Sequence, residues 1–146
     1  MKVIAVIPAR YKSTRFEGKP LVNLCGKPMI WWVHHQLCQV KGLSEIYVAT
    51  DDERIRKVCS DYGIKYVMTS DSHPTHLDRL AEFAENIESD FYININGDEP
   101  LMMPEYVERL LPTSDLNPVD FYFANAMTKI KKTVEVADIS RIKVVT

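Results

Sequence analysis

Strand-like and helix-like segments alternate along this 146-residue chain, and this order constrains the fold more than any other feature. Apolar runs bounded by turn residues predict strands, and apolar residues recurring at i, i+3, i+4 and i+7 predict helices. Strict alternation of the two predicts an α/β fold, with a doubly wound, mostly parallel sheet and helices on both faces. The predicted strands are 2–9, 45–50, 65–69, 91–95, 121–127 and 141–146, and the predicted helices begin at Pro28, after an N-cap at Asp51, near Leu80 and after Pro104.

The first apolar run also bears on the cellular compartment. It carries one basic residue, Lys2, and continues into Pro8-Ala9-Arg10 without a small-residue cleavage site, so we interpret it as a buried strand and not as a signal peptide. No stretch approaches the roughly 20 apolar residues of a membrane helix. Cys25, Cys38 and Cys59 have no paired spacing and are expected to be free thiols, with Cys59 buried. We therefore expect a cytoplasmic protein with no membrane partner.

The charge of the chain is distributed unevenly. Its 18 basic and 20 acidic residues give a net charge of −2, but the segment from Arg10 to Lys27 holds five basic residues and one acidic residue. The remainder of the chain therefore carries a charge of −6. A basic loop on an acidic body favours a small polyanion as ligand. Nucleic acid binding usually needs a broad basic face, so we expect no nucleic acid partner.

The predicted sheet indicates where a ligand binds. In open parallel sheets, ligands lie beyond the carboxyl ends of the strands, where the connecting loops meet. Three predicted loops qualify, at residues 8–20, 70–79 and 96–100.

The loop after the first strand is rich in groups that bind phosphate. It lacks the glycine pattern of a dinucleotide-binding loop and the Gly-Lys-Ser/Thr of a Walker A loop. However, Arg10 and Arg15 supply guanidinium forks that match phosphate oxygens, and Lys19 supplies a compact charge. Ser13 and Thr14 add hydroxyl groups. A solvated basic loop is the alternative interpretation, and the position directly after a buried strand favours phosphate binding.

Several motifs carry a family resemblance that extends over essentially the whole chain. The pattern Pro-Ala-Arg-x-x-Ser-Thr-Arg-x-x-Gly-Lys-Pro-Leu at 8–21 is followed by Gly-Lys-Pro-Met-Ile at 26–30, Ala-Thr-Asp-Asp-Glu-Arg-Ile at 49–55, Met-Thr-Ser at 68–70 and Asn-Gly-Asp-Glu-Pro at 96–100. In this order they resemble the 3-deoxy-manno-octulosonate cytidylyltransferases (CMP-Kdo synthetases), which have a Rossmann-like nucleotidyltransferase fold. The resemblance implies transfer of CMP from CTP to a Kdo-type sugar acid, with release of pyrophosphate, for lipopolysaccharide or capsule precursors.

The resemblance also implies a magnesium cofactor, Mg²⁺. Asp98 matches the family's magnesium ligand, and it follows a predicted strand and Gly97 at the edge where the basic loop is expected. A triphosphate is usually bound together with a divalent ion that one or two carboxylates hold. A turn or N-cap aspartate is the alternative interpretation.

Roles for further residues follow from the same resemblance. The expected catalytic residues are Arg10, Arg15, Lys19 and Asp98. The expected nucleotide-binding residues are Pro8, Ala9, Arg10, Ser13, Lys19, Thr75, Arg79 and Gly97. Asn96 stands where many family members have glutamine and is expected to contact the sugar-acid substrate.

The segment after the third predicted strand departs from the family pattern His-x-Ser-Gly-Thr-Asp/Glu-Arg. This chain reads His73-Pro74-Thr75-His76-Leu77-Asp78-Arg79, so His76 replaces a glycine and restricts the backbone. Arg79 keeps the family position, although a surface ion pair with Asp78 or Glu82 is an equally good interpretation. Candidate zinc ligands, which we rank below a plain surface loop, are Asp71, His73, His76 and Asp78.

The family pattern continues beyond the last residue of this chain. The resemblance therefore implies that residues 1–146 are the nucleotide-binding portion of a single, truncated cytidylyltransferase domain. The missing part is expected to hold a second magnesium-binding aspartate, most of the sugar-acid pocket and a homodimer interface. Two alternatives stay open: a cytidylyltransferase for another acidic substrate, such as an amino-sugar acid or a phosphonate, and a non-catalytic nucleotide-binding module.

Overall fold

The computed structural model describes residues 1–13, 16–113, 122 and 124–126. Among these, all helices and strands belong to one unit, Met1–Leu111. Thr14, Arg15 and the predicted strand at 141–146 lie outside the described residues. Of the predicted strand at 121–127, the described residues 122 and 124–126 are not in a strand.

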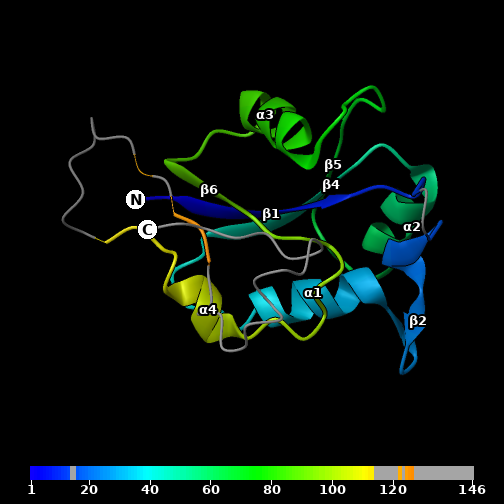
Figure 1. Ribbon diagram of the computed structural model, residues 1–146, viewed down its shortest axis with the longest axis horizontal. Coiled ribbons are helices and arrows are strands. Elements are labelled where there is room, and N and C mark those ends of the chain that lie inside the picture. The colour runs from blue at the N-terminus through cyan, green and yellow to red at the C-terminus, as the bar shows by residue number, and fades with distance from the viewer. Residues whose placement is uncertain (14–15, 114–121, 123, 127–146) are drawn as a thin grey trace, which may run out of the picture. The chain divides into compact units, whose positions relative to one another are not determined.

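A four-stranded parallel sheet forms the centre of the unit (Figure 1). Its strands are β1 (Val3–Ala9), β4 (Glu45–Thr50), β5 (Tyr66–Met68) and β6 (Phe91–Asn94), in the spatial order β5-β4-β1-β6. In the register, Val6 of β1 is the partner of Tyr47 in β4 and of Asn94 in β6. Each strand agrees with its predicted range to within one residue at each end.

The connections between strands place helices on both faces of the sheet. The helices are α1 (Met29–Leu37), α2 (Glu53–Asp61), α3 (His76–Asn86) and α4 (Pro104–Glu108). The chain moves outward from β1 to β4 and β5, and then returns past β1 to β6. Because such connections are right-handed, α1 and α2 lie on one face and α3 on the other, as Figure 1 shows for α1 and α3. The prediction of a doubly wound parallel sheet is thus confirmed.

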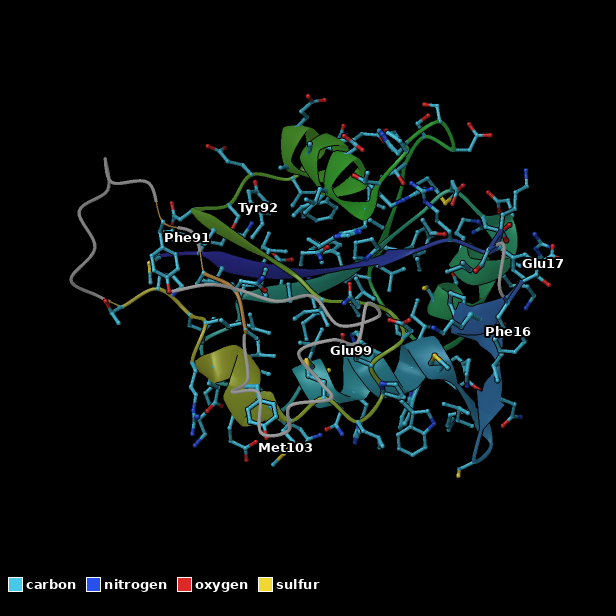
Figure 2. All side chains as sticks on the ribbon, in the orientation of Figure 1. Phe16, Glu17, Phe91, Tyr92, Glu99 and Met103 are labelled. Carbon is cyan, nitrogen blue, oxygen red and sulfur yellow. The ribbon has the colours of Figure 1, made fainter. Side chains whose placement is uncertain are left out.

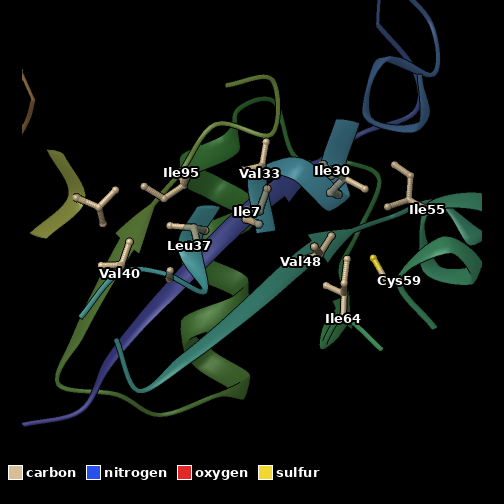
Figure 3. Close-up of a cluster of buried hydrophobic side chains, with 13 residues drawn as sticks. Ile7, Ile30, Val33, Leu37, Val40, Val48, Ile55, Cys59, Ile64 and Ile95 are labelled. Carbon is tan, nitrogen blue, oxygen red and sulfur yellow. The ribbon is translucent and has the colours of Figure 1, made fainter. Parts of the chain in front are cut away.

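Two apolar clusters fill the space between the sheet and the helices. On one face, Ile7 of β1 packs with Val33 of α1 and Cys59 of α2 (Figure 3). On the other face, Val6 packs against Phe83 of α3. The continuous apolar run of β1 therefore reflects burial on both faces. Cys59 is buried as predicted, and burial raises the pKa of its thiol to about 12. Within the described residues, no helix is long and apolar enough to cross a membrane.

A short hairpin interrupts the segment that the sequence predicts to be a loop. After the 3-10 helix η1 (Lys19–Leu21), β2 (Asn23–Leu24) pairs antiparallel with β3 (Lys27–Pro28). The two residues at its tip, Cys25 and Gly26, have φ angles of 49° and 86°. Positive φ at both positions is typical of a type I′ turn. The pair lacks the Asn-Gly or Asp-Gly signal of such turns, so the sequence prediction missed it.

The N-cap of α2 also differs from the prediction by one residue. Asp52, and not Asp51, caps this helix: its Oδ1 atom accepts a hydrogen bond from the backbone N–H of Arg54 at 2.9 Å. The carboxylate of Asp51 instead lies 3.3 Å from the guanidinium of Arg79.

Candidate functional site

The strand order reverses between β1 and β6, and the two loops that follow these strands meet there. At this point Lys19 Nζ, from the loop after β1, pairs with Asp98 Oδ2, from the loop after β6. Both side chains remain partly exposed, at 36% and 44%. The structure therefore brings together two of the four predicted catalytic residues at the edge where ligands of such sheets bind.

Local backbone contacts fix the position of Lys19. The N–H of Gly18 donates to the carbonyl oxygen of Tyr11 at 2.8 Å, which closes the loop after β1. Gly18 has a φ of 69°, a left-handed conformation that glycine adopts without strain. Leu21 N–H donates back to the Gly18 carbonyl at 2.8 Å, and Pro20 is buried. Lys19 thus stands in a tight 3-10 turn.

The loop after β6 lies directly on the end of β1. A Cβ atom at Gly97 would lie 3.4 Å from both the Ile7 side chain and the carbonyl oxygen of Pro8. Within this loop, Asn96 Nδ2 donates a hydrogen bond to Glu99 Oε1 at 2.9 Å, so the side chains on either side of Gly97 and Asp98 contact each other. These contacts place Gly97, the residue before Asp98, against Pro8 at the predicted border of the nucleotide site.

Arg10 connects the first loop to the segment before α3. Its Nη2 atom donates to the carbonyl oxygen of His73 and, at 3.2 Å, to that of Thr75. The structure therefore brings three predicted site residues, Arg10, Lys19 and Thr75, onto two loops that touch each other. Ser13 lies nearby in the sequence, and its hydroxyl accepts a long hydrogen bond of 3.5 Å from Phe16 N–H.

The altered segment at 75–77 forms the beginning of α3. Thr75 caps the helix, because its hydroxyl accepts from Asp78 N–H at 3.2 Å while Asp78 Oδ2 accepts from Thr75 N–H at 2.9 Å. The hydrogen bond from the Thr75 hydroxyl lowers the pKa of the Asp78 carboxyl. His76 and Leu77 are exposed in the first turn, so neither disturbs this capping box.

Arg79 corrects one sequence interpretation. It makes no surface ion pair with Asp78 or Glu82 but is fully buried, with its Nη1 bound to Thr69 Oγ1 and its Nη2 3.3 Å from Asp51. Burial lowers the pKa of its guanidinium. Its Nε and Nη2 atoms have no hydrogen-bond acceptor among the described residues. Arg79 therefore joins α3 to the ends of β4 and β5, which the sequence pattern did not indicate.

The zinc interpretation has no support in the described part of the chain. No group of three or more His, Cys, Asp or Glu side chains there could hold a metal ion. His73 Nε2 pairs with Glu82 Oε2, and this contact lowers the pKa of the Glu82 carboxyl.

Two surface depressions, of about 300 and 560 Å³, contain none of the predicted site residues. Arg10, Lys19, Thr75 and Asp98 instead lie on the segments that follow β1, β5 and β6.

A parallel sheet whose order reverses between a basic loop and a carboxylate defines an α/β domain with its ligand-binding edge at that reversal. The sequence model of the cytidylyltransferase family matches residues 4–146. The chain belongs to the cytidylyltransferase family, and the predicted family resemblance is confirmed.

Individual relatives agree with this assignment. The chain is 47% identical over 110 residues to a 3-deoxy-manno-octulosonate cytidylyltransferase from Escherichia coli, covering 75% of this chain and 45% of the relative. It is 42% identical over 147 residues to one from Geotalea uraniireducens (strain Rf4), covering 100% and 58%. It is 40% identical over 148 residues to an 8-amino-3,8-dideoxy-manno-octulosonate cytidylyltransferase from Shewanella sp. (strain W3-18-1), covering 99% and 60%. The chain therefore spans about half the length of these relatives.

Solved structures show the same fold. A CMP:2-keto-3-deoxy-manno-octonic acid synthetase complexed with CTP has a TM-score of 0.74 and 46% identity, covering 75% of this chain and 46% of that one. A cytidylyltransferase from Leptospira borgpetersenii has a TM-score of 0.66 at 22% identity, covering 75% and 47%, and bears on the fold alone.

Proposed function

We propose that this chain is the nucleotide-binding part of an enzyme that transfers CMP from CTP to a hydroxyl group of a 3-deoxy-manno-octulosonate-type sugar acid. Relatives named for that activity and a structural neighbour complexed with CTP support the proposal. The observation that carries it is the pairing of Lys19 with Asp98 where the strand order reverses. At this edge the Lys19 ammonium suits the phosphates of a triphosphate, and the Asp98 carboxylate suits the divalent cation that accompanies them.

In this reaction the acceptor oxygen forms a bond to the α-phosphorus of CTP. The bond from that phosphorus to the bridging oxygen breaks, pyrophosphate leaves, and the acceptor hydroxyl loses its proton. The protein contributes mainly positioning and charge neutralisation. In our proposal Arg10, Arg15 and Lys19 bind the triphosphate and the departing pyrophosphate. Arg10 then exchanges its carbonyl acceptors on the segment before α3 for anionic oxygens, which form stronger hydrogen bonds.

The remaining predicted contacts fit two kinds of role. Pro8, Ala9, Ser13 and Gly97 border the nucleotide, and Asn96 contacts the sugar acid. Thr75 and Arg79 shape the third loop instead, because the Thr75 hydroxyl is engaged with Asp78 and the Arg79 guanidinium is buried.

The donor set at Asp98 fits a magnesium ion. Mg²⁺ is held by one or two protein carboxylates together with water and phosphate oxygens, so one accessible carboxylate is enough. Bound there, the ion supplies positive charge to the phosphate oxygens. In the structure, the ammonium of Lys19 pairs with the Asp98 carboxylate. If a divalent cation bound that carboxylate instead, the Lys19 ammonium could contact a phosphate oxygen.

A second acceptor has specific support. Relatives named 8-amino-3,8-dideoxy-manno-octulosonate cytidylyltransferase match nearly the whole chain. Pyrophosphate release with the hydroxy sugar acid and with the amino sugar acid therefore distinguishes the two acceptors. From the resemblance alone, we further propose that the complete protein is a cytoplasmic homodimer, for which sedimentation of the complete protein is the test of the dimer.

The experiment is to mix the complete protein with CTP, Mg²⁺ and either sugar acid and to measure pyrophosphate. We expect release that requires both the metal and the acceptor. Faster release with the amino compound supports the second acceptor. CTP binding without pyrophosphate release would support a non-catalytic module and contradict the proposal.

A further inference from the structure

Two residues outside the proposed reaction connect the Lys19 loop to the rest of the molecule. Tyr11 stands at the beginning of this loop, and Arg54 lies in the first turn of α2. The guanidinium carbon of Arg54 lies 3.2 Å from the centroid of the Tyr11 ring. This is a close cation–π contact between an aromatic face and a planar cation.

Arg54 is itself held in place, although its side chain is 54% exposed. Its Nε and Nη2 atoms donate to the two carboxylate oxygens of Asp52, at 2.9 and 2.7 Å. Such a bidentate pair fixes the plane of the guanidinium. Asp52 N–H donates in turn to Thr50 Oγ1 at 3.2 Å, at the end of β4. The cation on the Tyr11 ring is thus anchored to the central sheet.

The Tyr11 ring also lies against Gly18, the residue that precedes Lys19. A Cβ atom at Gly18 would lie 3.0 Å from two carbon atoms of the ring. The Tyr11 carbonyl also accepts the Gly18 N–H, so backbone and ring both hold Gly18. η1, which begins at Lys19, packs against α2, and Figure 2 shows Phe16 and Glu17 of the same loop on the α2 side of the sheet.

We infer that Tyr11 and Arg54 are a positioning pair that holds the loop so that Lys19 faces Asp98. The inference rests on the proposed function, because triphosphate binding is what makes this position of Lys19 useful. Neither residue needs to touch the nucleotide, since both act through Gly18 and Lys19. A purely stabilising contact would affect CTP and CMP equally. A positioning pair instead affects mainly CTP, whose triphosphate tail Lys19 binds.

The test uses variants of the complete protein. Arg54→Met removes the guanidinium, and Tyr11→Leu removes the ring. Tyr11→Phe keeps the ring and should behave like the wild type. Lys57→Met is the matched control, because Lys57 lies on the same helix and pairs with Asp61 at 2.6 Å. Dissociation constants for CTP and CMP are measured by calorimetry, and hydrogen exchange is followed at the Gly18 amide.

Arg54→Met and Tyr11→Leu should each weaken CTP binding by about two- to five-fold, the range of one exposed cation–π contact, and should leave CMP binding unchanged. They should also speed exchange at Gly18, whereas Lys57→Met and Tyr11→Phe should change neither quantity. Equal losses for CTP and CMP, or unchanged Gly18 exchange, would overturn the inference. If wild type binds no CTP, the proposed function fails by itself, and Gly18 exchange still decides whether Tyr11 and Arg54 hold the loop.

Discussion

The Nζ atom of Lys19 contacts the Oδ2 atom of Asp98, although the two residues are 79 positions apart in the sequence. Each follows one of two adjacent parallel strands, β1 and β6, so the sheet brings them together. A partly exposed ion pair of this kind contributes little to stability. The fold therefore depends little on this pair, so both residues can be replaced to test their proposed role in ligand binding.

Replacing Lys19 with alanine should separate triphosphate binding from base binding. A charge-assisted contact contributes about 1.5–3 kcal/mol, so Lys19→Ala should weaken CTP binding by about 10- to 100-fold. CMP binding should change little, because CMP lacks the outer phosphates. Lys12→Ala, which removes an exposed lysine from the same loop, is the control. Equal losses for CTP and CMP in a calorimetric titration would contradict the assignment of Lys19.

Replacing Asp98 with asparagine tests the magnesium proposal. Asp98→Asn keeps the size of the side chain but removes the charge that would hold Mg²⁺ beside the triphosphate. Added magnesium should then no longer tighten CTP binding. Glu99→Gln is the matched control, since Glu99 is the adjacent carboxylate and accepts from Asn96. A magnesium effect that survives in Asp98→Asn would show that the ion binds elsewhere.

A side chain at Gly18 should lower the free energy of unfolding for two separable reasons. Gly18→Ala forces a residue with a Cβ atom into φ 69° and places that atom 3.0 Å from the Tyr11 ring. Backbone strain and overpacking together should cost about 1–3 kcal/mol of unfolding free energy. Gly63→Ala is the comparison, because Gly63 has φ 67° and nothing within 4 Å of the added atom. If urea unfolding gives equal losses for both variants, the Tyr11 ring does not restrict Gly18.

The carboxylate of Glu45 should make the fold sensitive to acid. Hydrogen bonds from Lys65, Tyr47 and Lys2 lower the pKa of Glu45 from 4.5 to about 2. Because the folded state holds the charged form, the stabilisation is complete above pH 4.5 and is lost as the pH falls toward about 2. Glu45→Gln should therefore flatten the dependence of unfolding free energy on pH in this window. Parallel pH profiles for both proteins would exclude Glu45 as the cause.

The central strand β1 could be predicted because it is buried on both faces. The run Val3–Ala9 is apolar throughout, and its short length is typical of a buried strand. The placement of Lys19 and Asp98 at one edge followed from the order of the elements. Their pairing needed the register between β1 and β6, which depends on contacts between segments far apart in the sequence.

The burial of Arg79 could not be predicted from local patterns. Arginine at a helix start is usually a surface residue, and only the fold brings Asp51 and Thr69 close to the guanidinium of Arg79. The contact between Arg54 and Tyr11 escaped prediction for the same reason, because one residue lies in α2 and the other in the loop after β1. Side chains that join loops are determined by tertiary structure, whereas strands and helices are determined largely by local sequence.

The return of the chain past β1 to form β6 has a consequence for the order of folding. β1, β4 and β5 can assemble from the first 68 residues, but Asp98 reaches Lys19 only after β6 has docked on the opposite side of β1. Contacts of such long sequence separation form slowly, because the intervening chain must first be closed into a loop. The pairing of Lys19 with Asp98 therefore arises late, and a ligand held between the two loops would draw the folding equilibrium toward the completed sheet.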